Sequence, residues 1–122
     1  MDNNEIKKIE SKAKEIYSEP NYEAEPFLET AENIIEAGMD LRFLKIFVMA
    51  YKDLQNIKRD IGEDIHCNQK TITHERNLEV IQKHERFWEL ESSLSNYCYE
   101  LHLAKQNIEK LTDKYLGENN EQ

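Results

Sequence analysis

The chain has 122 residues and a formal net charge of −9, with 34% charged and only 39% hydrophobic residues. This length allows one domain with a modest core and excludes two. The negative charge argues against a protein that binds nucleic acid by neutralising phosphates, and it suits a basic partner. Only three glycines and two prolines occur, which favours amphipathic helices over sheets.

The sequence shows no export or membrane signal. The opening residues MDNNEIKK lack the apolar core of a signal peptide, and the longest mostly apolar window, 43–51, is too short to span a bilayer. Cys67 and Cys98 are the only cysteines. Without a secretory context, we expect both to be reduced thiols in a cytoplasmic protein.

The first predicted helix covers residues 2–17. Its apolar residues recur at helical spacing, and Asp2 or Asn3 can cap its N-terminus. Pro20 follows shortly after and cannot continue the helix, because it lacks a backbone N–H and restricts the residue before it. We therefore expect a break near residue 19.

The second predicted helix covers residues 25–37. Pro26 falls in its first turn, where a missing N–H costs least, and Gly38 is placed to stop it. The spacing of four, three and four residues puts a set of carboxylates on one exposed face. This predicted stripe consists of Glu25, Glu29, Glu32 and Glu36.

The third predicted helix covers residues 41–61, with Asp40 as its cap and 62–70 as the connection that follows. It has two apolar faces, and a helix with two apolar faces is surrounded by neighbours. We therefore expect it to be the most buried element. The first face holds Leu44, Phe47, Val48, Tyr51, Leu54 and Ile61, and the second holds Phe43, Ile46, Ala50 and Ile57.

The fourth predicted helix is the longest, from Thr71 or Thr73 to Leu116. We expect it to end at Gly117, so that residues 1–117 form one helical domain and 118–122 a disordered polar tail. Its apolar residues alternate in steps of three and four, which is a heptad seam. The predicted dimer seam is Phe87, Leu90, Leu94, Tyr97, Leu101, Ala104, Ile108 and Leu111, and the pattern continues to Tyr115.

A helix of this length extends well beyond the third one. The excess either folds back at Ser92-Ser93 or projects and pairs with a second copy. A parallel pair would bring Arg86 to Glu91 and Glu100 to Lys105, which are attractive contacts. The flanking charges thus favour a homodimer, and burial of the same stripe within one chain is the alternative.

Charge is unevenly distributed along the chain. Residues 19–40 hold seven acids and no base, whereas residues 41–60 hold five bases and two acids. Adjacent antiparallel helices of opposite sign attract, although surface pairs contribute only about 0.2–1 kcal/mol each. The acidic stripe is thus either a solvated face that its neighbour partly neutralises or a docking surface for a basic protein.

One segment resembles a catalytic motif. Residues 59–66, RDIGEDIH, are similar to the R-x4-6-H signature of the HEPN ribonucleases, small all-helical proteins that pair two such sites across a dimer. The resemblance implies that His66 takes part in RNA cleavage and that Arg59 positions the phosphate. The pair lies in mid-chain rather than near the C-terminus, and we expect Gly62 to end the helix between its two members.

A second resemblance concerns magnesium. Glu29-x-x-Glu32 and Asp60-x-x-Glu63 are similar to the paired motifs of the all-α nucleotide pyrophosphohydrolases of the MazG and dimeric dUTPase type. In that family, carboxylates from adjacent helices hold Mg²⁺. Here the second motif is reversed and contains Gly62.

Zinc is the third candidate. Cys98 and His102 lie four residues apart on one helical face, a spacing that can hold zinc, and His66 adjoins Cys67. Nothing in the sequence brings the two pairs together. We therefore interpret Cys98 as a packed thiol and expect no metal and no cofactor.

These patterns together predict an all-α antiparallel bundle of about four helices with a long C-terminal coiled-coil-like helix. We expect a non-enzymatic interaction module, such as an adaptor, an inhibitor or an antitoxin-like regulator, that docks its acidic stripe on a basic partner and can mimic nucleic acid. We further expect a homodimer, without direct nucleic-acid or membrane binding. The HEPN-like ribonuclease and the pyrophosphohydrolase remain alternatives.

Overall fold

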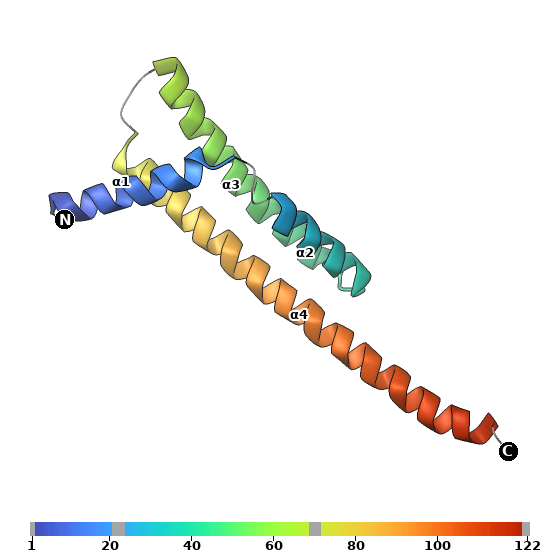
Figure 1. Cartoon of the computed structure of the whole chain (residues 1–122). Helices are drawn as coiled ribbons and strands as arrows, with labels where there is room; N and C mark the ends of the chain where they lie inside the picture. The colour runs from blue at the N-terminus through green and yellow to red at the C-terminus, as the bar shows by residue number, and fades with distance from the viewer. Residues whose placement is uncertain (1, 21–23, 69–71, 121–122) are drawn as a thin grey trace.

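The computed structural model describes residues 2–20, 24–68 and 72–120, and within them the chain forms helices only (Figure 1). The predicted fold class is confirmed, because a helical bundle carries a long C-terminal helix. The helices of the described residues are α1 (Asn3–Ser18), α2 (Ala24–Glu36), α3 (Leu41–Asn68) and α4 (His74–Asn120).

The antiparallel pair of α3 and α4 is the framework of the bundle. Both α1 and α2 pack against this pair, and within the described residues they do not contact each other. Figure 1 shows α1 crossing the pair near the start of α4, while α2 runs beside the other half of α3. A cross-section through the bundle therefore cuts three helices, namely α3, α4 and either α1 or α2.

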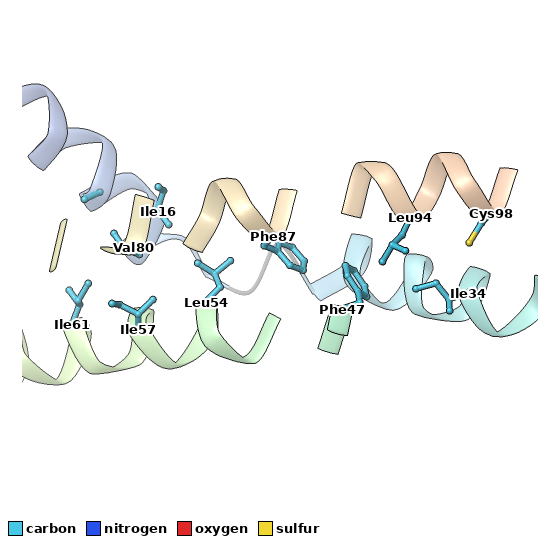
Figure 2. Close-up of a cluster of buried hydrophobic side chains, with 11 residues drawn as sticks. Ile16, Ile34, Phe47, Leu54, Ile57, Ile61, Val80, Phe87, Leu94 and Cys98 are labelled. Carbon is cyan, nitrogen blue, oxygen red and sulfur yellow. The ribbon is translucent and has the colours of Figure 1, made fainter. Parts of the chain in front are cut away.

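The core is one line of side chains between α3 and α4 (Figure 2). At its centre Phe47 and Phe87 are fully buried, and their rings stack 5.4 Å apart. Phe27 of α2 stacks on Phe47 at 5.0 Å and on Tyr51 at 4.0 Å. These rings join three helices, and aromatic pairs of this kind contribute about 0.5–1.5 kcal/mol beyond their burial.

Aliphatic side chains extend the core to both sides of these rings. At the α1 end, Ile16 and Val80 face residues of α3, and at the α2 end Leu94 and Cys98 face Ile34 (Figure 2). A hydroxyl pair, Thr30 Oγ1 and Ser95 Oγ at 3.2 Å, adds a polar link between α2 and α4. The buried apolar set is Ala13, Ile16, Ile34, Phe47, Leu54, Ile57, Ile61, Val80, Phe87, Leu94 and Cys98.

Three side chains cap helix N-termini. Asp2 Oδ1 and Thr73 Oγ1 each accept the backbone N–H three residues further on, at 2.9 and 3.3 Å. Asp40 Oδ1 accepts the N–H of Arg42 at 2.9 Å, which confirms Asp40 as the predicted cap. The Arg42 guanidinium also donates to Asp40 Oδ2, and these bonds lower the pKa of the Asp40 carboxyl.

The turn between α2 and α3 depends on Gly38. Its φ is +72°, a left-handed conformation that residues with a side chain rarely adopt. Gly38 N–H donates to the Ile35 carbonyl at 3.1 Å, and Met39 N–H donates to the Ile34 carbonyl at 3.3 Å. This is a Schellman motif, so Gly38 ends α2 as predicted.

The predicted end of α3 is wrong. The helix passes through Gly62, so residues 62–68 are helical rather than part of a connection; the rest of that connection lies outside the described residues. A glycine inside a helix costs only about 0.5–1 kcal/mol, which neighbouring interactions offset. Ile61 is fully buried beside it, and Asp64 pairs with Arg76 of α4 at 3.7 Å.

The predicted end of α4 is also too early. The helix does not fold back at Ser92-Ser93, and it passes through Gly117 to Asn120. Of the tail expected to be disordered, residues 118–120 are therefore helical, and 121–122 lie outside the described residues. Figure 1 shows the last part of α4 projecting beyond every other helix.

Replacing Gly38 and Gly62 by alanine is expected to change stability in opposite directions. A Cβ meets no atom within 4 Å at either position, so backbone conformation alone decides the effect. Gly38→Ala is expected to lower the free energy of unfolding by roughly 1–2 kcal/mol, because its φ is positive. Gly62→Ala is expected to raise it by about 0.5–1 kcal/mol.

Urea unfolding followed by far-UV circular dichroism measures both changes. A stabilising Gly38→Ala, or a destabilising Gly62→Ala, would contradict this account of the two glycines.

Candidate interaction surfaces

The four glutamates of the predicted stripe lie on the outward face of α2. All four are exposed, and the buried residues of α2, Thr30 and Ile34, lie on its opposite side. Among the described residues the ion pairs join α1 to α4, join α3 to α4, or link near neighbours, and none includes a residue of α2. The expected neutralisation of α2 by ion pairs with α3 is therefore not seen there.

Two exposed aliphatic residues lie beside these carboxylates. Leu28 is 56% exposed and Ile35 is 62% exposed. They are seven residues apart, so they lie on the same side of the helix, next to Glu25 and Glu32. We call this mixed surface the acidic face; it consists of Glu25, Leu28, Glu29, Glu32, Ile35 and Glu36.

The predicted dimer seam on α4 is divided between core and surface. Phe87 and Leu94 are buried within the chain, so they are not available to a second copy. Val80 and Cys98 of α4 are buried in the same core as these two residues, whereas Leu90 is only partly buried. The core stripe is thus rotated away from the predicted seam, and pairing by the remaining seam residues stays a prediction.

Beyond this core, no other helix of the described residues covers α4. Every side chain from 102 to 116 is exposed. Ile108, Leu111 and Tyr115 are 54–64% exposed although their spacing continues the heptad pattern. We call this stripe the α4 ridge; it begins at the partly buried Leu101 and continues through the exposed Ala104, Ile108, Leu111 and Tyr115.

An apolar groove lies between α3 and α4. Phe43 and Ile46, on the predicted second face of α3, are 41% and 52% exposed, so α3 is not surrounded as expected. The rings of Phe43 and Tyr97 lie 6.2 Å apart across the groove. We call this hollow of about 480 Å³ the α3–α4 groove; it is lined by Phe43, Ile46, Leu90, Ser93, Leu94 and Tyr97.

Arg59 and His66 lie on one face of α3, because the helix continues through Gly62. Seven residues separate them by about 10 Å along the helix axis. Both side chains are exposed, and the Arg59 guanidinium lies 3.7 Å from the Asp60 carboxylate. This chain alone therefore does not enclose a phosphate between them.

The carboxylates proposed to hold magnesium do not converge. Glu29 and Glu32 project from the outward face of α2, whereas Asp60 and Glu63 lie near the far end of α3. Among the described residues, no group of three or more His, Cys, Asp or Glu side chains is placed to hold a metal ion. The pyrophosphohydrolase alternative thus lacks the geometry that it requires.

The candidate zinc residues are also apart. Cys98 is buried, and its Sγ donates at 3.4 Å to Sδ of Met39, which lies in the turn between α2 and α3. His102 contacts Gln106 at 3.1 Å on the surface. Cys67 is exposed at the opposite end of α3. Burial raises the pKa of the Cys98 thiol, as expected for a packed cysteine.

The two cysteines are expected to react at very different rates with iodoacetamide at pH 7.5. Cys67 is exposed, whereas burial and a raised pKa both reduce the reactive thiolate of Cys98. Peptide mapping by mass spectrometry should show alkylation of Cys67 at least tenfold faster, and equal rates after urea unfolding. Equal rates in the folded protein would show that Cys98 is not held in the core.

The comparisons with known proteins assign no family. No protein-family model matches the chain, and neither a curated protein nor a solved structure matches it. Within the described ranges, no helix has both the length and the apolar character needed to cross a membrane.

Proposed function

We propose that this protein is a non-catalytic interaction module that docks the acidic face of α2 on a basic surface of a partner protein. One observation carries the proposal: among the described residues, Glu25, Glu29, Glu32 and Glu36 are exposed without an ion pair. Like charges at this helical spacing repel and lower helix stability. A cationic partner would relieve that repulsion.

The exposed aliphatics define the partner further. Leu28 and Ile35 give the acidic face an apolar component that a purely solvated stripe lacks. A matching partner surface presents Lys or Arg around a small apolar patch. Arginine suits it best, since its guanidinium can bind a carboxylate through two parallel hydrogen bonds. The charges would speed association, and the aliphatic contacts would slow dissociation.

Adaptor, inhibitor and antitoxin-like regulator are the roles that such a surface serves. A row of carboxylates can also occupy the phosphate-binding surface of a nucleic-acid-binding protein, and an inhibitor of this kind is a specific form of the proposal. Its partner would be released by competing duplex DNA. The ribonuclease alternative has weaker support, because Arg59 and His66 are exposed and unenclosed.

Reversing three charges of the acidic face is expected to abolish partner capture. The variant Glu29→Lys/Glu32→Lys/Glu36→Lys replaces an attractive surface by a repulsive one. Captured proteins are compared by quantitative mass spectrometry after pull-down at 50 and 300 mM salt. The amount of each partner captured by the wild type should fall at least tenfold when the variant is used. Capture by the wild type should also fall at 300 mM salt, because screening weakens exposed charge contacts.

The matched control reverses three exposed acids elsewhere, Glu63→Lys/Glu89→Lys/Glu109→Lys, with the same change in net charge. This control should capture the same partners as the wild type. Circular dichroism verifies that both variants keep their helicity. Undiminished capture by the α2 variant would reject the acidic face as the docking surface.

A further inference from the structure

We infer that the protein forms an antiparallel homodimer in which the α4 ridge of each copy lies in the α3–α4 groove of the other. This inference goes beyond the proposed function, because it concerns a different surface and a different partner. It starts from two apolar surfaces that one chain leaves uncovered, a projecting helix and a hollow between two helices.

The groove and the ridge belong to one continuous stripe of α4. Leu90 and Tyr97 line the groove, and two further heptads lead from Leu90 to Ala104 and from Tyr97 to Leu111 of the ridge. Residues seven apart lie almost in line along a helix. A second helix laid along this stripe therefore contacts the groove with one half and the ridge with the other.

The shapes of the two surfaces favour the antiparallel direction. Among the described residues, no other helix packs against the ridge, and the groove is a hollow between α3 and α4. The ridge of one copy can therefore lie in the groove of the other. A parallel pair would place ridge on ridge and groove on groove. An antiparallel pair fills both grooves through reciprocal contacts, as a two-fold dimer requires.

Charge supports the same direction. Of the contacts expected for a parallel pair, one needs Glu91, which is partly buried within its own chain. A parallel dimer would also bring together the two acidic segments 19–40, with seven acids each. In an antiparallel dimer these segments lie end to end on either side of the two-fold axis rather than side by side, because α2 packs on α4 near Ser95, and this reduces their repulsion.

A register that fills the groove follows from the heptad pattern. Antiparallel helices place the a positions of one copy opposite the d positions of the other. Leu101 is an a position and Ala104 is a d position, and the two-fold axis of the proposed register passes between them. Flanking positions then bring Glu100 beside Asn107 and Ser93 beside Lys114, so like charges do not meet there. The facing pairs between copies are Leu101 with Ala104, Tyr97 with Ile108, and Leu90 with Tyr115.

The area available suits a stable dimer. Each copy contributes six large apolar side chains that are about half exposed, three in the groove and three on the ridge. An aromatic side chain buries 150–250 Å² when it is fully covered, and about half of that area is still exposed on these residues. Together with the flanking residues, this approaches the roughly 800 Å² per protomer that is typical of specific interfaces. The groove residues are Phe43, Ile46 and Tyr97, and the ridge residues are Ile108, Leu111 and Tyr115.

Molar mass in solution tests the dimer and both of its surfaces. Light scattering coupled to size exclusion at micromolar concentration should give twice the mass of the chain for the wild type. Ile108→Glu on the ridge and Ile46→Glu in the groove should each weaken dimerisation at least 100-fold. Both side chains are exposed in the single chain, so both variants should still fold, and circular dichroism verifies that they do.

Leu103→Glu is the matched control, since Leu103 lies on the side of α4 opposite the ridge and should leave the dimer intact. A monomeric wild type overturns the inference, as does an Ile46→Glu variant that remains dimeric. The triple lysine variant of the acidic face should keep the dimeric mass, so failure of the dimer and failure of partner docking are distinguishable.

A spin label on Lys114→Cys, in a Cys67→Ser background, tests the direction. In the proposed register the two labels are about 35 Å apart along the helix axis. Each label lies about three helical turns from the two-fold axis, and the two labels lie on opposite sides of it. In a parallel dimer they would lie side by side with no axial separation. Pulsed dipolar spectroscopy distinguishes the two, and a short distance overturns the antiparallel arrangement.

Discussion

The mismatch in length between α3 and α4 is the constraint on which the rest of the structure depends. α3 has 28 residues and α4 has 47, so the antiparallel pair can bury only the first part of α4. In that part the rings of Phe47 and Phe87 stack between the two helices, and Phe27 joins α2 to them. Past Leu101, the same heptad pattern continues without a neighbour. One sequence pattern therefore serves as core and as surface.

The two short helices explain why the groove stays open. α1 and α2 follow each other along the α3–α4 pair, so together they supply one covering layer. The α3–α4 groove is left uncovered, and Phe43 and Ile46 remain partly exposed. The described residues include no further helix that could cover it, and this is why we propose a second copy of the chain as its occupant.

The acidic face and the α4 ridge are separate surfaces with different chemistry. The first offers carboxylates beside two aliphatic residues, and the second offers a row of apolar residues. An antiparallel dimer would present two acidic faces, one on each side of the two-fold axis, and so would be a bivalent binder. It would also keep the two Arg59–His66 pairs apart, which is the opposite of what a paired ribonuclease site needs.

The sequence by itself determined the helical class, the cap at Asp40 and the stop at Gly38, because these depend on contacts within a few residues, and it narrowed the start of the last helix to Thr71 or Thr73. It could not locate the ends at Gly62 and Gly117, since a glycine inside a helix is only a weak penalty that surrounding interactions offset. Only the tertiary structure decided which apolar residues are covered. Periodicity shows that a stripe is suited to burial, whereas the position and length of neighbouring helices decide whether Phe87 enters the core and Ile108 stays in solvent.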